Sequence, residues 1–229
     1  MTTDEHQDIE TTRGIWRRWT LAFTIGELLG FGGIPVLGAA IALALTSHLE
    51  PAARSLVLYA IAVTGGAGEG AVLGWFQMRV LRRVLPHVPE RRWILATATA
   101  AALAWALGML APTLDDLVGL SAAGRFAIWI PSGIVILLSI GVAQAWVLRG
   151  VVTKPRRWVI ANVIGWLAGL PWTFVLPALL PEKAPAAVWV LTFVVAGTLM
   201  GLTAGAITGR TLIRITGTPV AWEPSHDGG

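Results

Sequence analysis

Six apolar segments, each long enough to cross a bilayer, constrain the fold of this chain more than any other feature. A transmembrane helix needs about 20 predominantly apolar residues. Runs of this length cover residues 19–46, 55–80, 93–113, 126–148, 158–180 and 186–209. Only 13% of all residues are charged, and the mean hydropathy is +0.69. Because a soluble domain of this size needs more surface charge, the sequence predicts an all-α integral membrane protein with six transmembrane helices.

The basic residues predict the orientation of these helices. With the N-terminus placed inside, only Arg54, Arg125 and Lys183 of the 17 Lys and Arg residues fall outside. Cytoplasmic loops carry such an excess of Lys and Arg, so both termini should be cytoplasmic. The acidic, polar first residues do not resemble a cleavable signal peptide. Arginine far outnumbers lysine, a bias associated with GC-rich bacterial genomes, and we expect a multi-pass protein of the bacterial inner membrane.

The triplet Arg-Arg-Trp occurs three times, each time before an apolar run. Arginines at such a boundary contact anionic headgroups, while tryptophan rings occupy the interface with their N–H groups in water. A specific lipid-headgroup or partner site on this face is the alternative. The predicted membrane-interface anchors are Arg17, Arg18, Trp19, Arg91, Arg92, Trp93, Arg156, Arg157 and Trp158.

The triplets also mark an internal repeat. Small residues follow each tryptophan at +3, +7 and +11, and glycines recur at spacings of four or eight in the even-numbered segments. The pattern predicts three tandem two-helix hairpins in a pseudo-threefold arrangement, at 17–83, 91–149 and 156–214, between polar cytoplasmic tails at 1–16 and 215–229. Small residues allow helices to approach closely in lipid. The alternative is that one such ridge joins protomers. The glycines predicted to pack helices are Gly66, Gly70, Gly74, Gly133, Gly141, Gly197, Gly201, Gly205 and Gly209.

Two glutamates stand inside the apolar segments. Glu27 and Glu69 each lie about 12–15 Å along a helix from the nearest arginine-rich boundary, hence near the middle of the bilayer. The corresponding repeat positions hold Ala101 and Trp166 for Glu27, and apolar residues for Glu69. Ionisable groups at this depth are costly and usually functional. We expect either a proton-, cation- or ligand-binding site or protonated carboxyl groups that hydrogen-bond between helices.

Other polar residues form a second group of candidates. Gln77, Gln144 and Thr208 occupy equivalent positions near the cytoplasmic end. They are expected to hydrogen-bond between helices and fix their register, with a gate or selectivity element as the alternative. Asn162 and Trp166 are candidates for lining a pocket, although core packing explains Trp166 equally well.

The remaining features restrict the function. The chain has no cysteine, and its four histidines lie outside the apolar interiors, so no metal site or cofactor is expected. No catalytic constellation is present, and no enzyme activity is expected. Arginines at membrane edges explain the net charge of +4 without nucleic acid. Two functions remain: binding or transport of a small or lipid-like molecule, or a non-catalytic scaffold. The expected partners are the bilayer and either another membrane protein or a second copy.

Overall fold

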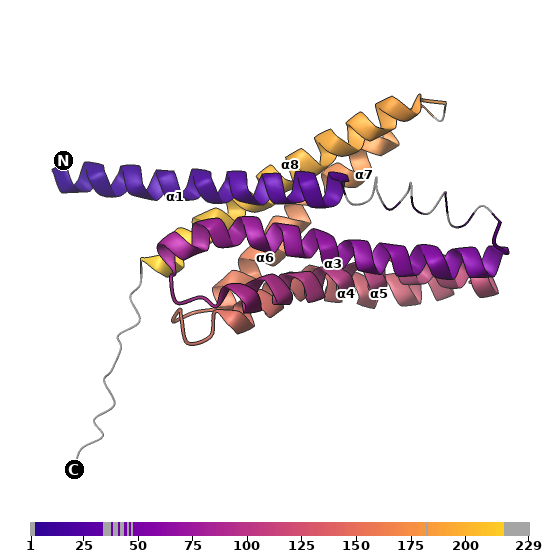
Figure 1. Ribbon diagram of the computed structural model, residues 1–229, viewed down its shortest axis with the longest axis horizontal. Helices are drawn as coiled ribbons and strands as arrows, with labels where there is room; N and C mark the ends of the chain where they lie inside the picture. Colours follow the sequence, from indigo (N-terminus) through magenta and orange to yellow (C-terminus); the bar gives the residue numbers. More distant parts are fainter. Residues whose placement is uncertain are drawn as a thin grey trace, which may run out of the picture.

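The computed structural model describes residues 3–33, 48–181 and 183–217, with isolated positions at 38, 41, 44 and 46; side chains are described from residue 12 onward, except 31 and 32. Within these residues the chain is helical and contains no strand. The elements are α1 (Thr3–Glu27), the π-helix η1 (Leu28–Gly33), α3 (Pro51–Val84), α4 (Glu90–Val118), α5 (Ala122–Val147), α6 (Arg156–Gly169), α7 (Pro171–Ala178) and α8 (Ala186–Thr216) (Figure 1).

Five helical segments in the described part of the chain are long and apolar enough to cross a membrane. They are Pro51–Val84, Glu90–Val118, Ala122–Val147, Arg156–Ala178 and Ala186–Thr216, matching the last five predicted spans. Large apolar side chains such as Phe174 and Leu179 are 69% and 74% exposed, as expected of surfaces that contact lipid. The findings therefore support a multi-pass helical membrane protein in contact with the bilayer.

The first predicted span is only partly described. Its first nine residues belong to α1, and η1 follows directly, but most of 34–47 lies outside the described residues. The N-terminal segment 1–16, predicted as a polar tail, is helical from Thr3 onward and continuous with the span. Of the predicted C-terminal tail, 218–229 lies outside the described residues.

Local sequence signals account for several helix boundaries. Pro51 begins α3, where a missing backbone N–H costs nothing. Gly119, with φ of 66°, ends α4 in the left-handed conformation. The Ser121 side chain caps α5 by accepting from Gly124 N at 3.1 Å. Pro171 separates α6 from α7, so the fifth predicted span is two consecutive helices rather than one.

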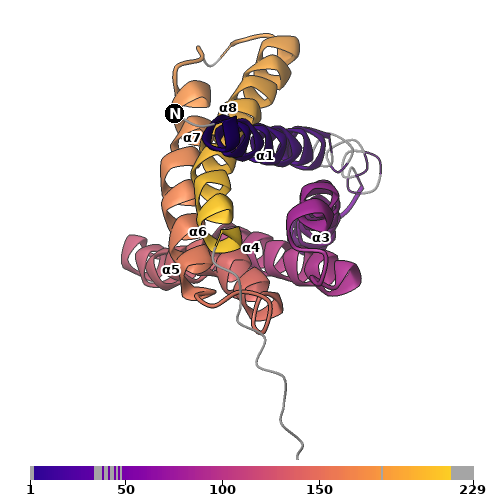
Figure 2. The same ribbon diagram turned by 90° about the vertical axis from the view of Figure 1, so that its left-hand side faces the viewer.

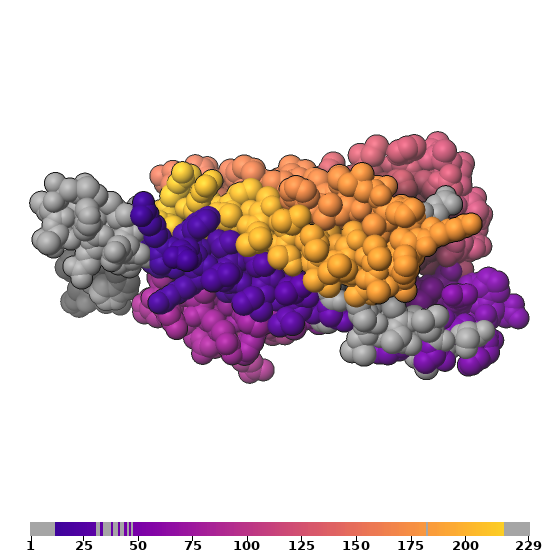
Figure 3. All heavy atoms as spheres, turned by 90° about the horizontal axis from the view of Figure 1, so that it is seen from above, coloured from indigo at the N-terminus to yellow at the C-terminus, as the bar shows by residue number. Residues whose placement is uncertain are grey.

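The long helices pack in a closed ring. Each helix contacts the next one in the order α1, α3, α4, α5, α6 and α8, and α8 in turn contacts α1 (Figure 2). Seen from above, α1 and α8 lie side by side although they are at opposite ends of the chain (Figure 3). The α3–α4 and α5–α6 loops, the N-terminal half of α1 and the end of α8 lie at one end of the ring (Figure 1). We call this the arginine-rich end, after Arg82 and Arg83 in the last turn of α3 and Arg214 in the last turn of α8.

Glycines set three of the helix contacts around this ring. At each of them an added methyl group would lie about 3 Å from the neighbouring helix, tighter than ordinary van der Waals contact. The neighbours occupy the same positions, +1 and +4, relative to the tryptophan of each triplet. The contacts join Gly74 to Ile94 and Thr97, Gly141 to Val159 and Asn162, and Gly205 to Phe23 and Thr20.

One glycine predicted to pack helices does not do so. A methyl group built on Gly133 has no described atom within 4 Å, so the predicted packing role is wrong for this residue. Gly133 lies about two turns from Gly141 in α5, and a methyl group at Gly141 would lie against Asn162 and Val159 of α6. By contrast, a methyl group at Gly70 would lie 2.6 Å from both the Ala101 Cβ and the Thr97 carbonyl oxygen.

Candidate functional site

Glu69 lies near the middle of α3, in a glycine-rich stretch that lets α4 come close. The ring of Trp105 lies against Gly66, where even a methyl group would come within 2.2 Å of its Cδ1 atom. This position brings the Trp105 indole to Glu69, and its Nε1–H donates to Glu69 Oε2 at 2.8 Å. Glu69 is only 9% exposed. The missing side chain at Gly66 is therefore what allows an aromatic donor to reach a buried carboxyl group.

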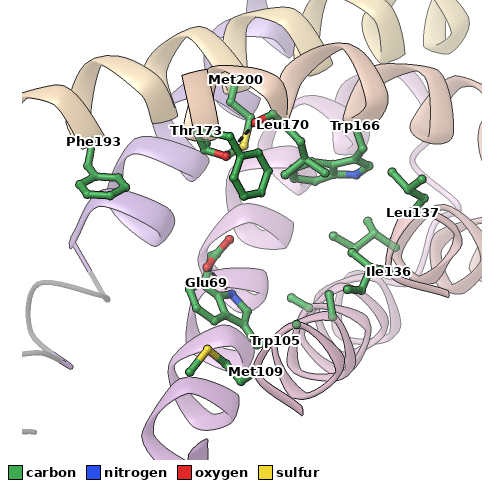
Figure 4. Close-up of a pocket in the computed structure, with 15 residues that line it drawn as sticks. Glu69, Trp105, Met109, Ile136, Leu137, Trp166, Leu170, Thr173, Phe193 and Met200 are labelled. Carbon is green, nitrogen blue, oxygen red and sulfur yellow. Dashed lines mark hydrogen bonds between the residues drawn. The ribbon is translucent and has the colours of Figure 1, made fainter. Parts of the chain in front are cut away.

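Glu69 lines a cavity of about 390 Å³ between the helices. Glu69 and Trp105 lie on one side, and Trp166, Leu170 and Met200 lie across from them (Figure 4). The walls come from α3, α4, α5, α6, α7 and α8, so the cavity exists only because the ring closes. Cavities that bind small molecules are mostly apolar with a few placed polar groups, and this cavity has that character.

Glu27 is the last residue of α1 and immediately precedes η1. It is fully buried, and its side chain packs against Gly201 on α8, where the missing side chain leaves room for it. Neither carboxyl oxygen has a hydrogen-bond partner among the described residues, and no other buried side-chain nitrogen or oxygen there lacks one. Buried polar groups are almost always satisfied, so Glu27 is the outstanding exception in this part of the chain.

The two glutamates belong to one region of the protein. One turn beyond Glu27, Gly30 lies against Glu69, and a methyl group there would come within 2.8 Å of the Glu69 Cγ. The π-helical turns of η1 lie at this contact, and such turns are frequent at functional sites. The described residues include no group of three or more side chains suited to a metal ion.

The other predicted polar residues meet elsewhere, near the arginine-rich end. Gln144 lies at the centre of their network. Its Nε2–H groups donate to Gln77 Oε1 at 2.8 Å and to Thr97 Oγ1 at 2.9 Å. Its Oε1 accepts from Trp158 Nε1–H at 2.9 Å. Both glutamines are almost completely buried, so each amide is held by partners from other helices.

The tryptophans of all three triplets join this network. Trp93 donates to Gln77 at 3.0 Å, and Trp19 donates to Thr208 at 2.9 Å. The ring of Trp158 lies between the other two, with centroid distances of 5.4 Å to Trp19 and 6.0 Å to Trp93. All three rings are 0% exposed. We call these five residues, together with Gln144 and Thr97, the tryptophan–amide cluster.

This cluster corrects one prediction. Trp19, Trp93 and Trp158 were expected to hold their N–H groups in interfacial water, but each donates to a buried side chain inside the ring. Buried tryptophan rings need such a partner, and Gln77, Gln144 and Thr208 provide it. The arginines of the triplets are exposed beside them, and their contact with lipid headgroups stays a prediction.

The candidate residues therefore fall into separate groups. Trp166 lines the cavity with Glu69, but Asn162 does not: its Nδ2–H donates to the Trp158 carbonyl oxygen at 2.9 Å, and its Cβ faces Gly141. Gln77, Gln144 and Thr208 are also outside the cavity lining. The predicted packing residue Gly197 is buried in α8, and Gly209 faces the Trp19 ring.

Sequence reasoning missed Trp105. Trp93, Thr97, Ala101 and Trp105 follow one another at intervals of four, so they share one face of α4. This is the face that packs on the glycines of α3. This row of four residues, which starts and ends with tryptophan, is the sequence signal for the role of Trp105.

Comparisons with known proteins do not identify a relative. No protein-family model matches the sequence, and neither curated proteins nor solved structures gave a significant match.

Proposed function

We propose that this protein binds a small amphipathic, lipid-like molecule in the cavity beside Glu69. The observation that carries the proposal is a carboxyl group on the wall of an otherwise largely apolar cavity of about 390 Å³. An apolar body would contact Trp166, Leu170 and Met200, and a cationic or hydrogen-bond-donating group would lie at Glu69. A cation is favoured because a buried carboxylate needs a compensating charge. Such a binding function requires no catalytic group.

Transport of the bound molecule, with a proton or cation as the coupled species, is the second part of this proposal. Glu27 supports it, because it is fully buried and has no donor among the described residues, and such a carboxyl group is costly when ionised and unpaired. The backbone is irregular at η1 and again where Pro171 separates α6 from α7. Irregular backbone at membrane depth is tolerated where it is buried in protein or lines a cavity.

The binding proposal is tested with two probes of the same shape and opposite charge. Tetraphenylphosphonium is an apolar cation, and tetraphenylborate is the matching anion. We expect the purified full-length protein to bind the cation more tightly, and Glu69→Gln to weaken this binding about tenfold, or ~1.4 kcal/mol. Glu90→Gln is the control, since Glu90 is outside the cavity and pairs with Arg82 at 3.6 Å. Equal binding of both ions, or equal effects of the two substitutions, would contradict the proposal.

The alternative is a scaffold in which the glutamates hold helices together. Glu27 gives it specific support, because this last residue of α1 packs directly against Gly201 on α8. Under this alternative, Glu27→Gln and Glu69→Gln lower thermal stability strongly and leave probe binding without a charge preference. Under the binding proposal, Glu69→Gln leaves stability nearly unchanged and removes the preference for the cation.

We also infer that the three hairpins are copies related by a pseudo-threefold axis along the membrane normal. The inference is supported by the equivalent glycines, each of which contacts the residues at +1 and +4 from the triplet tryptophan of the next hairpin. The third hairpin contacts the first in the same way, through α8 and α1. The glycine ridges would then be the repeated packing element. Three hairpins whose contacts close into a ring need no partner to complete the packing, although a membrane protein partner or second copy could still bind the outer surface.

The proposed orientation places the arginine-rich end in the cytoplasm of a bacterial cell, with the chain in the inner membrane. The absence of cysteine allows a direct test with single cysteines. Thr153 lies in the α5–α6 loop and Ser121 lies at the start of α5, and both residues are exposed. Each is replaced by cysteine in a separate variant. In intact cells a membrane-impermeant maleimide should label Ser121→Cys and not Thr153→Cys. The reverse pattern would invert the topology.

A further inference from the structure

A second hollow lies between α6 and α8, near the arginine-rich end and separate from the Glu69 cavity. Its volume is about 570 Å³. The residues that matter for its chemistry are Arg157, Ile160 and Ile164 of α6 and Ile207, Arg210 and Arg214 of α8. We call it the arginine groove.

The groove has a basic end and an aliphatic end. On α6, Ile160 and Ile164 follow Arg157 at +3 and +7, which places them on the same face and up to about 10 Å deeper along the helix. On α8, Ile207 precedes Arg210 by three residues and therefore also lies deeper than the cation. Both walls thus change from guanidinium to isoleucine in the same direction, from the arginine-rich end toward the middle of the ring.

The side chains at the basic end are accessible. Arg157 and Arg210 are exposed, and neither side chain forms an ion pair or hydrogen bond with the residues that the structure describes. Ile160 and Ile164 are 57% and 50% exposed, so the aliphatic wall is open as well. Guanidinium groups bind phosphate through paired, charge-assisted hydrogen bonds.

We propose that the arginine groove binds an anionic phospholipid. The phosphate contacts Arg157 and Arg210, and an acyl chain lies along the isoleucines. The order of basic and aliphatic side chains along the groove favours a phospholipid over a free anion. A soluble phosphate would contact only the arginines. A phospholipid would place its phosphate at the arginines and its acyl chains along the isoleucines, which lie deeper. Basic pockets between helices on the cytoplasmic side suit such headgroups. This inference does not depend on the proposed role of Glu69.

The test measures binding of individual lipids to the purified full-length protein by native mass spectrometry. Phosphatidylglycerol is compared with phosphatidylcholine carrying the same chains. The double variant Arg157→Gln/Arg210→Gln should weaken phosphatidylglycerol binding about 30-fold, which corresponds to ~1 kcal/mol per arginine. The matched control is Arg91→Gln/Arg92→Gln, which removes two exposed arginines of an equivalent triplet and should change binding less than threefold.

Several outcomes would overturn the proposal. Equal losses in the two double variants would mean that only general basic charge attracts the lipid. Equal binding of both lipids to the unsubstituted protein would remove the requirement for an anion. Displacement of the lipid by millimolar glycerol 3-phosphate would identify an anion site without a role for the chains. Ile160→Ala/Ile164→Ala keeps all charges and should also weaken binding several-fold; an unchanged affinity would contradict the acyl-chain contact even if the arginine variant failed to fold.

Discussion

Replacing Gln144 by leucine should destabilise the protein by about 2–4 kcal/mol, although leucine is apolar and of similar size. The variant loses the two hydrogen bonds that Gln144 donates to Gln77 and Thr97. Hydrogen bonds between transmembrane helices average ~0.6 kcal/mol each. The larger part comes from Trp158. Its N–H keeps no acceptor in a fully buried position, and an orphaned buried donor costs ~1–3 kcal/mol.

The assay is unfolding of the purified protein by sodium dodecyl sulfate in mixed micelles, followed by circular dichroism. Thr203→Val is the matched control, because it removes an indole acceptor that is 3.3 Å from the partly exposed Trp172 Nε1–H and should cost less than about 0.5 kcal/mol. A double-mutant cycle with Trp158→Phe should give a coupling energy of about 1–2 kcal/mol. If Gln144→Leu is no more destabilising than the control, or the cycle gives no coupling, the cluster does not stabilise the ring.

Three further predictions concern helix packing and the Glu69 site. Gly70→Ala should lower the free energy of unfolding by about 1–3 kcal/mol through overpacking against Ala101. The control Gly133→Ala should change it by less than about 0.5 kcal/mol, because the added methyl group has no described neighbour. Equal values in the same unfolding assay would disprove the assigned contacts. Trp105→Phe should keep the fold and change tetraphenylphosphonium affinity at least threefold by removing the donor to Glu69, and unchanged affinity would mean that this bond does not position the carboxyl group. Gly66→Ala should disturb the same site by displacing the Trp105 ring, seen as a similar change in affinity.

The sequence alone was sufficient to predict helices and their approximate limits. Hydropathy is summed along the chain, so five predicted spans agree with α3 to α8 even though nothing about their neighbours was known. The break at Pro171 is also local in origin, and the proline itself was visible in the sequence. Distance along a helix predicts depth in a membrane, and the position of Glu27 and Glu69 near its middle stays a prediction.

Only the tertiary structure decided which faces meet. The local sequence around a tryptophan beside arginines is the same whether its N–H faces interfacial water or Gln144. The two arrangements differ by a rotation about the helix axis, which no local pattern specifies. The same rotation places Trp105 on Glu69, turns Asn162 away from the cavity and leaves Gly133 without a neighbour. The cavity itself requires walls from six helices. Hydropathy and spacing are properties of one helix at a time, whereas a site between helices depends on how all of them close into a ring.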